Sequence, residues 1–270
     1  MIQYLIVTQL FFTGIQAPAI VNGIFKPTEP KQGEFPYHAN LMLIHDKKYY
    51  SFCGGSLIHP RWVLSAAHCI RLDIDHPAIK PQAIFIALGS VFRNSRGAQI
   101  LGVARTIIHP TYLETDRNDI ALLKLKTAAD LGPNVKVIKL HTSNGEDLLG
   151  KTVFLTGFGI TNDLRDTPEK LRKATLHVNT INKCFSEKEY ANIEICATST
   201  MSEGKACKGD SGGPLVLQQN GHLIQVGITS HLALLPFCRF QFNNSVYTRV
   251  SAYIEWLSKV TGVNFNTYPF

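Results

Sequence analysis

Short runs of alternating or uniformly apolar residues dominate the chain after residue 20. The clearest runs are residues 39–44, 56–58, 62–65, 83–88, 120–125, 152–156, 215–217 and 223–228. Clusters of Gly, Pro, Asn and Asp separate them roughly every ten residues, a pattern typical of all-β proteins. We therefore expect strands through most of the chain.

Only the end of the chain has a helical period. Tyr253, Trp256, Leu257 and Val260 recur at i, i+3, i+4 and i+7, and Ser251 can cap the first turn. The pattern predicts a helix over about residues 251–261. We expect this helix to follow two β-barrels, with the connection between the barrels near residues 128–136.

The amino terminus has a different character, because residues 1–19 contain no charge. The apolar stretch from Tyr4 to Ile15 is too short to span a membrane comfortably. We interpret residues 1–17 as a secretory signal that ends at Ala17. The first residues lack Lys and Arg, and Ile15 occupies the −3 position, so a buried N-terminal strand is the alternative.

Composition narrows the class of protein. The chain has 270 residues, 45% of them hydrophobic and 17% charged, which excludes a disordered polyelectrolyte. The net charge of +7 comes from scattered Lys and Arg, so we expect a slightly basic surface and no nucleic-acid partner. Six cysteines suit three disulfides in an oxidising compartment, and no Cys-x-x-Cys or His cluster supports a metal site.

Three segments carry candidate chemistry: residues 62–69 (WVLSAAHC), 118–123 (NDIALL) and 207–214 (CKGDSGGP). A serine such as Ser211 is a poor nucleophile unless a histidine such as His68 takes its proton. A buried carboxylate, here Asp119, then holds the imidazole in one tautomer. Gly209 lets its own N–H approach a developing oxyanion together with the N–H of Ser211.

These motifs, their order and the cysteines make the chain resemble the chymotrypsin family of secreted serine endopeptidases from residue 20 to about 260. Three disulfides together with the loop at residues 204–207 (GKAC) resemble its arthropod chymotrypsin- and collagenase-like members. The resemblance implies two packed six-stranded antiparallel Greek-key barrels and a C-terminal helix. The peptidase domain would cover residues 20–262, with barrels over about 20–133 and 134–250 and a tail at 263–270. It also implies His68 as general base, Asp119 as orienting acid and Ser211 as nucleophile.

The same resemblance implies the disulfides Cys53–Cys69, Cys184–Cys196 and Cys207–Cys238, although six cysteines alone permit fifteen connectivities. No cofactor is expected. The calcium loop of some relatives is also expected to be absent, because residues 76–113 contain no Asp or Glu.

Residues 20–23 (IVNG) resemble the mature start of the family, and this resemblance implies how the chain would be activated. A freed Ile20 ammonium would pair with Asp210. Relatives usually cut after Arg or Lys, but this chain has Pro18 and Ala19, so we expect a dipeptidyl peptidase to remove this two-residue propeptide.

The specificity pocket departs from the trypsin-like pattern. Lys205 stands where trypsin-like relatives carry Asp, so cleavage after Lys or Arg is disfavoured. Lys205 either faces the pocket and favours acidic side chains, or turns to solvent and leaves an apolar pocket, which we favour because a buried unpaired ammonium is costly. The remaining expected substrate-binding residues are Lys208, Ser230, His231, Leu232 and Ser245.

Two function classes remain for this sequence. The first is an active, secreted and monomeric endopeptidase that acts on proteins or peptides and meets serpins or other protease inhibitors, without nucleic-acid or membrane partners. The second is a catalytically silent homologue that acts as a binding protein. Asn243 begins a glycosylation sequon, but its place beside the inferred pocket argues against occupancy.

Overall fold

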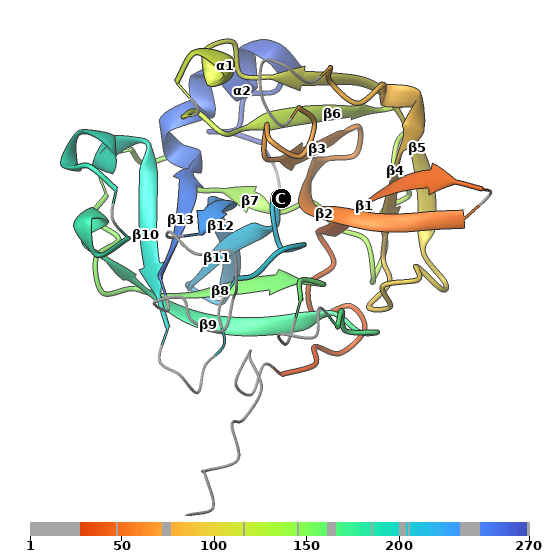
Figure 1. The fold of residues 1–270 in the computed structure, drawn as a ribbon, viewed down its shortest axis with the longest axis horizontal. Coiled ribbons are helices and arrows are strands. Elements are labelled where there is room, and N and C mark those ends of the chain that lie inside the picture. Colours follow the sequence, from red (N-terminus) through yellow and green to blue (C-terminus); the bar gives the residue numbers. More distant parts are fainter. Residues whose placement is uncertain are drawn as a thin grey trace, which may run out of the picture.

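The computed structural model describes residues 28–46, 48–71, 77–115, 117–144, 146–160, 166–184, 186–199, 204, 206–232 and 244–268. These residues form two antiparallel β-barrels with a short helix near the end of the chain (Figure 1). The predicted fold class is therefore confirmed. The predicted starting segment and Ile20 lie outside the described residues.

The N-terminal barrel is closed in the order β1-β2-β3-β6-β5-β4. Its strands are β1 (His38–His45), β2 (Lys48–His59), β3 (Trp62–Ser65), β4 (Ile84–Leu88), β5 (Gln99–Ile108) and β6 (Ala121–Leu125). Continuous apolar runs explain the buried parts of β1 to β4, in which consecutive side chains on both faces of the strand are buried. The hairpin of β1 and β2 carries a bulge between Leu41 and Met42.

The C-terminal barrel has the order β11-β8-β9-β10-β13-β12 and closes through pairing of β11 with β12. Its strands are β8 (Thr152–Gly157), β9 (Arg172–Asn179), β10 (Glu194–Thr198), β11 (Pro214–Gln219), β12 (His222–Leu232) and β13 (Asn244–Arg249). The short β7 (Lys139–Leu140) adds to β12 in parallel.

The helical segments are few and short among the described residues. They are the α-helices α1 (Tyr112–Thr115) and α2 (Ile254–Thr261) and the 3₁₀ turns η1 (Pro81–Ala83), η2 (Ile181–Cys184), η3 (Lys188–Asn192) and η4 (Val250–Tyr253). The predicted cap is wrong: Ser251 lies within η4, and the N-cap of α2 is Tyr253, because the chain enters the helix through a 3₁₀ turn. No helix in the described part is both long and apolar enough to cross a membrane.

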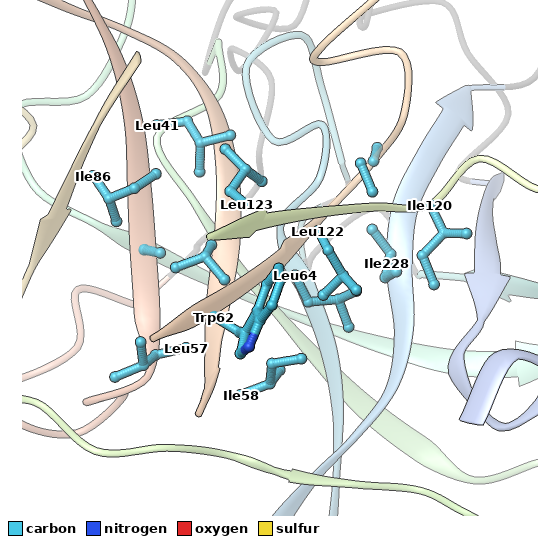
Figure 2. Close-up of a cluster of buried hydrophobic side chains, with 14 of the residues drawn as sticks. Leu41, Leu57, Ile58, Trp62, Leu64, Ile86, Ile120, Leu122, Leu123 and Ile228 are labelled. Carbon is cyan, nitrogen blue, oxygen red and sulfur yellow. The ribbon is translucent and has the colours of Figure 1, made fainter. Parts of the chain in front are cut away.

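A large apolar cluster fills the N-terminal barrel and continues under α2 (Figure 2). Leu41, Leu64, Ile86 and Leu122 are fully buried there. Ile228 of β12 joins the same cluster from the other barrel. This shared packing holds the two barrels together at the level where the site lies.

Candidate active site

The predicted catalytic residues His68, Asp119 and Ser211 lie where the two barrels meet. The Gly54 N–H donates to the Ser211 carbonyl at 2.7 Å, and the Ser56 hydroxyl donates to Gln225 Oε1 at 2.6 Å. The Thr248 hydroxyl donates to the Asp119 carbonyl at 2.8 Å. Each bond joins one barrel to the other, so the site rests on a fixed junction.

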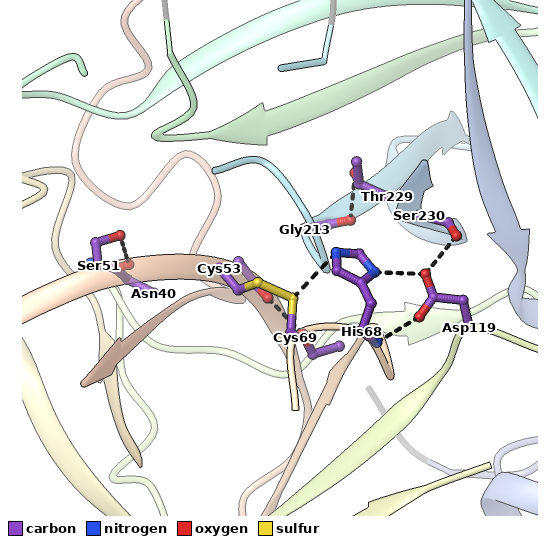
Figure 3. Close-up of a disulfide and its surroundings, with 11 residues drawn as sticks. Asn40, Ser51, Cys53, His68, Cys69, Asp119, Gly213, Thr229 and Ser230 are labelled. Atoms are coloured by element: carbon purple, nitrogen blue, oxygen red, sulfur yellow. Dashed lines mark hydrogen bonds and ion pairs between the residues drawn. A yellow bond between two sulfur atoms is a disulfide. The ribbon is translucent and has the colours of Figure 1, made fainter. Parts of the chain in front are cut away.

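His68 and Asp119 form a tight pair in the N-terminal barrel (Figure 3). His68 follows β3, and its Nδ1 lies 2.7 Å from Asp119 Oδ2. The backbone N–H of His68 donates to the other carboxylate oxygen at 2.9 Å. Because Nδ1–H points at the carboxylate, Nε2 of neutral His68 has a lone pair that can accept a proton. This nitrogen lies 3.9 Å from Cys69 Sγ (Figure 3).

The pair shifts the pKa of both members. Burial disfavours the imidazolium of His68, but the charge of Asp119 and its hydrogen bond outweigh burial and raise the His68 pKa above its usual 6.5. Burial opposes ionisation of Asp119, yet His68 and the hydrogen bonds from His68 and Ser230 lower the Asp119 pKa. A base with a raised pKa next to an ionised carboxylate suits proton transfer near neutral pH.

The segment before β6 places Asp119 accurately. Asn118 adopts a left-handed conformation with φ of 58°. Its Oδ1 accepts from the Tyr253 hydroxyl at 2.8 Å, and its Nδ2 donates to Thr111 Oγ1 at 2.9 Å. The side chain of Asn118 therefore ties Asp119 to both α2 and the α1 region.

Ser230 gives Asp119 a further donor from the C-terminal barrel. Its hydroxyl donates to Asp119 Oδ2 at 2.6 Å. Ser230 lies at an irregularity of β12, where the pairing with β13 shifts between Thr229 and His231. Such an irregularity re-aims a side chain out of the regular alternation.

The loop that carries Ser211 packs on the N-terminal barrel through glycines. A Cβ on Gly212, which has φ of 75°, would lie 2.2 Å from Ser65 Oγ and 2.6 Å from the Gly54 carbonyl oxygen. A Cβ on Gly54 would lie 2.9 Å from Gly213 Cα. Only glycine permits this approach, which brings Ser211 close to the segment leading into His68.

The backbone N–H groups of Gly209 and Ser211 are the predicted oxyanion donors. Gly209 has φ of 99°, another left-handed conformation. Within the described part of the chain, no acceptor pairs with the N–H of Gly209 or of Ser211. Two such donors beside a serine can stabilise an oxyanion.

The Asp210 side chain points away from these two N–H groups and into the C-terminal barrel. Its carboxylate accepts from Gly159 N–H at 2.8 Å and from Cys207 N–H at 2.9 Å. Burial raises the Asp210 pKa to about 6 in spite of these two bonds. A buried carboxylate with two neutral donors is well placed to take a cation.

An ion pair beside the site was not predicted from the sequence. Arg117 Nη1 lies 2.8 Å from Glu194 Oε1, and Ser186 Oγ donates to Glu194 Oε2 at 2.6 Å. The Arg117 guanidinium also stacks over the Tyr190 ring at 4.1 Å. Arg117 is two residues before Asp119, and that adjacency is the available sequence signal.

Two of the three predicted disulfides are present: Cys53–Cys69 and Cys184–Cys196. Cys207 is also disulfide-bonded, and its predicted partner Cys238 lies outside the described residues. The sulfurs of Cys53 and Cys69 lie near His68 in a metal-like grouping. Their bond to each other removes the thiolates that a metal would need.

The predicted pocket residues are only partly described. Lys205 and Asn243 lie outside the described residues, and Leu232 is described only as backbone of β12. Lys208 is exposed, and its carbonyl accepts from Ile160 N–H at 2.8 Å. Ser245 is buried in β13, and its carbonyl lies 3.2 Å from Cys184 Sγ. His231 is exposed on β12 next to Ser230.

The fold and the site together define a two-barrel β protein with a partly buried histidine–aspartate pair at the barrel junction. A family model described as Trypsin matches residues 24–257. The chain therefore belongs to the trypsin family.

Named relatives agree with this assignment. Serine protease SSP1 of Scolopendra subspinipes is 29% identical over 253 residues, which cover 91% of this chain and 87% of the relative. Chymotrypsin-like elastase family member 1 of Canis lupus familiaris is 29% identical over 244 residues, which cover 88% of this chain and 92% of the relative.

Proposed function

We propose that the protein is a serine endopeptidase that uses Ser211 as nucleophile, His68 as general base and Asp119 as orienting acid. The observation that carries this proposal is the His68–Asp119 pair at 2.7 Å, packed against the glycine-rich loop of Ser211. Family membership and relatives named as a serine protease and an elastase support the same reaction.

In the proposed reaction, His68 Nε2 takes the Ser211 hydroxyl proton as Oγ attacks the carbonyl carbon of the substrate. The N–H groups of Gly209 and Ser211 donate to the oxygen that becomes negative. His68 then gives its proton to the leaving amine, and an acyl group remains on Ser211. Water, deprotonated by His68, releases that acyl group in the second half of the reaction.

Activation would be coupled to Asp210. A chain that begins at Ile20 would offer an ammonium to the buried Asp210 carboxylate, and the pair would order the neighbouring oxyanion donors. N-terminal sequencing of the active protein tests this step. The expected start is Ile20, and an active form with another start would contradict the proposed activation.

We expect a preference unlike that of trypsin, of the chymotrypsin, elastase or collagenase kind. Lys205, at the position where trypsin-like relatives carry Asp, supports this preference, because a cation repels the Lys and Arg side chains of a substrate. Hydrolysis of peptides that differ only before the scissile bond measures it. Efficient cleavage after Arg would contradict the preference while leaving the reaction intact.

The proposed setting is extracellular, with protein or peptide substrates and with serpins or other protease inhibitors as partners of a monomeric enzyme. The test of the function itself is peptide hydrolysis by the chain that begins at Ile20. Replacement Ser211→Ala should abolish hydrolysis, because it removes the nucleophile. Hydrolysis that survives this replacement would overturn the proposal.

A further inference from the structure

His231 lies unusually close to Ser230. Its Nδ1 is 3.2 Å from Ser230 Oγ, although the two residues are consecutive on β12. Side chains of consecutive residues in a regular strand point to opposite faces. The shift in β12–β13 pairing between Thr229 and His231 brings both side chains to one side.

Counting protons fixes the direction of each hydrogen bond in this group. Ser230 has one hydroxyl proton, and Asp119 as a carboxylate has none, so the 2.6 Å contact has Ser230 as donor. The contact at 3.2 Å then requires His231 Nδ1–H as donor to Ser230 Oγ. Neutral His231 therefore has its proton on Nδ1, and Nε2 has a lone pair.

Two imidazoles are thus hydrogen-bonded to one carboxylate oxygen, one directly and one through a hydroxyl group. His68 Nδ1–H reaches Asp119 Oδ2 directly at 2.7 Å, and His231 Nδ1–H reaches it through the Ser230 hydroxyl. A donor to Ser230 Oγ polarises the Ser230 O–H bond and strengthens its donation to Asp119.

We propose that His231 is a positioning residue of the catalytic centre, which donates from Nδ1 to Ser230 Oγ and so holds the Ser230 hydroxyl toward Asp119. This inference rests on the proposed peptidase function. It differs from the substrate contact expected for His231, because the residue acts through Ser230 and Asp119.

The charges around His231 keep it neutral while His68 works. Although the His231 side chain is exposed at the surface, desolvation by the protein atoms packed around its ring lowers the His231 pKa. Glu194 and Asp119 oppose that shift, and Arg117 and His68 add to it. The His68 pKa is raised, so on acidification His68 takes a proton first. The imidazolium of His68 then opposes a second proton on His231. A neutral donor supports Asp119 without adding a cation that would weaken His68 as a base.

Nuclear magnetic resonance of histidine ring nitrogens tests the inference without relying on activity. In the protein that begins at Ile20, His231 should carry its proton on Nδ1 at neutral pH and titrate at a lower pH than His68. Replacement His68→Gln should raise the His231 pKa, and Ser230→Ala should weaken the Nδ1 preference. A His231 protonated on Nε2, or unaffected by both replacements, would overturn the inference.

Peptide hydrolysis provides a second test with matched variants. Asparagine can place its amide N–H near the position of Nδ1, whereas leucine cannot donate. His231→Leu should lower kcat about threefold to tenfold, the value of one net hydrogen bond, while His231→Asn should restore most of it. Equal loss in the two variants would contradict a donor role.

The two proposals fail in different ways. A wild-type protein without Ser211-dependent hydrolysis overturns the peptidase function, and the ring-nitrogen measurement still shows whether His231 donates to Ser230. A wild-type protein with normal hydrolysis and an Nε2-protonated His231 overturns only the positioning role.

Discussion

The N-terminal barrel holds His68 and Asp119 through side-chain hydrogen bonds, whereas the C-terminal barrel holds Ser211 through backbone contacts of glycines. Asp119 accepts from the backbone and ring of His68, and Asn118 anchors the segment around it. The Ser211 loop instead depends on the close approach of Gly212 to Ser65. Side-chain hydrogen bonds therefore fix the proposed base and acid, and the proposed nucleophile follows the backbone of its loop.

The barrels also differ in buried charge. Asp119 is buried with a histidine partner that lowers its pKa, but Asp210 is buried with neutral donors and has a pKa raised to about 6. The Asp119 carboxylate already has its partner in the described part of the chain. The Asp210 carboxylate is the point where activation would add a cation.

Replacement Asp119→Asn should have the largest effect, since it breaks the pair in the N-terminal barrel. An amide carries no charge and does not hold His68 in the required tautomer, so kcat should fall about 10³- to 10⁴-fold. Steady-state peptide hydrolysis measures the fall. Asp130→Asn, at an exposed acid of the same half, is the control and should keep full activity.

The two described disulfides should separate stability from catalysis. Replacing both Cys53 and Cys69 by Ser removes a link across 16 residues and should cost about 3 kcal/mol of unfolding free energy. It should also lower kcat, because Cys69 adjoins His68. Replacing Cys184 and Cys196, whose separation is 12, should cost a similar free energy and leave kcat nearly unchanged. Denaturant unfolding and hydrolysis by the folded fraction measure both, and equal kcat losses would contradict the distinction.

Gly212→Ala tests the backbone contacts of the Ser211 loop. The new methyl group would lie too close to Ser65 Oγ and the Gly54 carbonyl, so we expect kcat to fall about 10²-fold as Ser211 moves. Gly221→Ala is the matched control: Gly221 has a similar φ of 79°, but nothing lies within 4 Å of its added Cβ. The control should lose about 1 kcal/mol of stability and little activity. Similar kcat in both variants would show that the close packing is unimportant.

Asp210 should give the smallest effect, on the pH dependence of stability. Its folded pKa is raised to about 6 from 3.8, so the folded chain binds more protons than the unfolded chain between these values. The chain that retains residues 1–19 should therefore lose stability as the pH rises from about 4 to about 6, on the order of 2 kcal/mol. Thermal unfolding at several pH values measures the loss. The chain that begins at Ile20 should lose less, and identical curves would contradict pairing of Ile20 with Asp210.

Local pattern was enough for much of the fold. The apolar runs at residues 39–44 and 152–156 predicted β1 and β8, most of whose side chains are buried. The strand β9 begins with two charged residues, Arg172 and Lys173. Its alternation of buried and half-buried residues starts only at Ala174 and continues through Leu176 and Val178. The cap at Ser251 was wrong because tertiary packing continues a 3₁₀ turn through it.

The candidate site residues and the contact between His68 and Asp119 were predicted from the sequence, but the contacts that surround this pair were not. The bond from Ser230 to Asp119 spans 111 residues, and the Arg117–Glu194 bond spans 77. Such contacts depend on how the barrels pack, which a local pattern does not encode. The motifs predicted which groups would react, and the structure shows which contacts hold His68 and Asp119.

Labelling by a fluorophosphonate probe tests the central claim most directly, because the probe reacts only with a serine that an adjacent base activates. The protein that begins at Ile20 should be labelled on Ser211, as identified by peptide mass spectrometry. Labelling should disappear in Ser211→Ala and fall steeply in His68→Ala. A correctly processed protein that remains unlabelled would contradict the account and favour a catalytically silent binding protein.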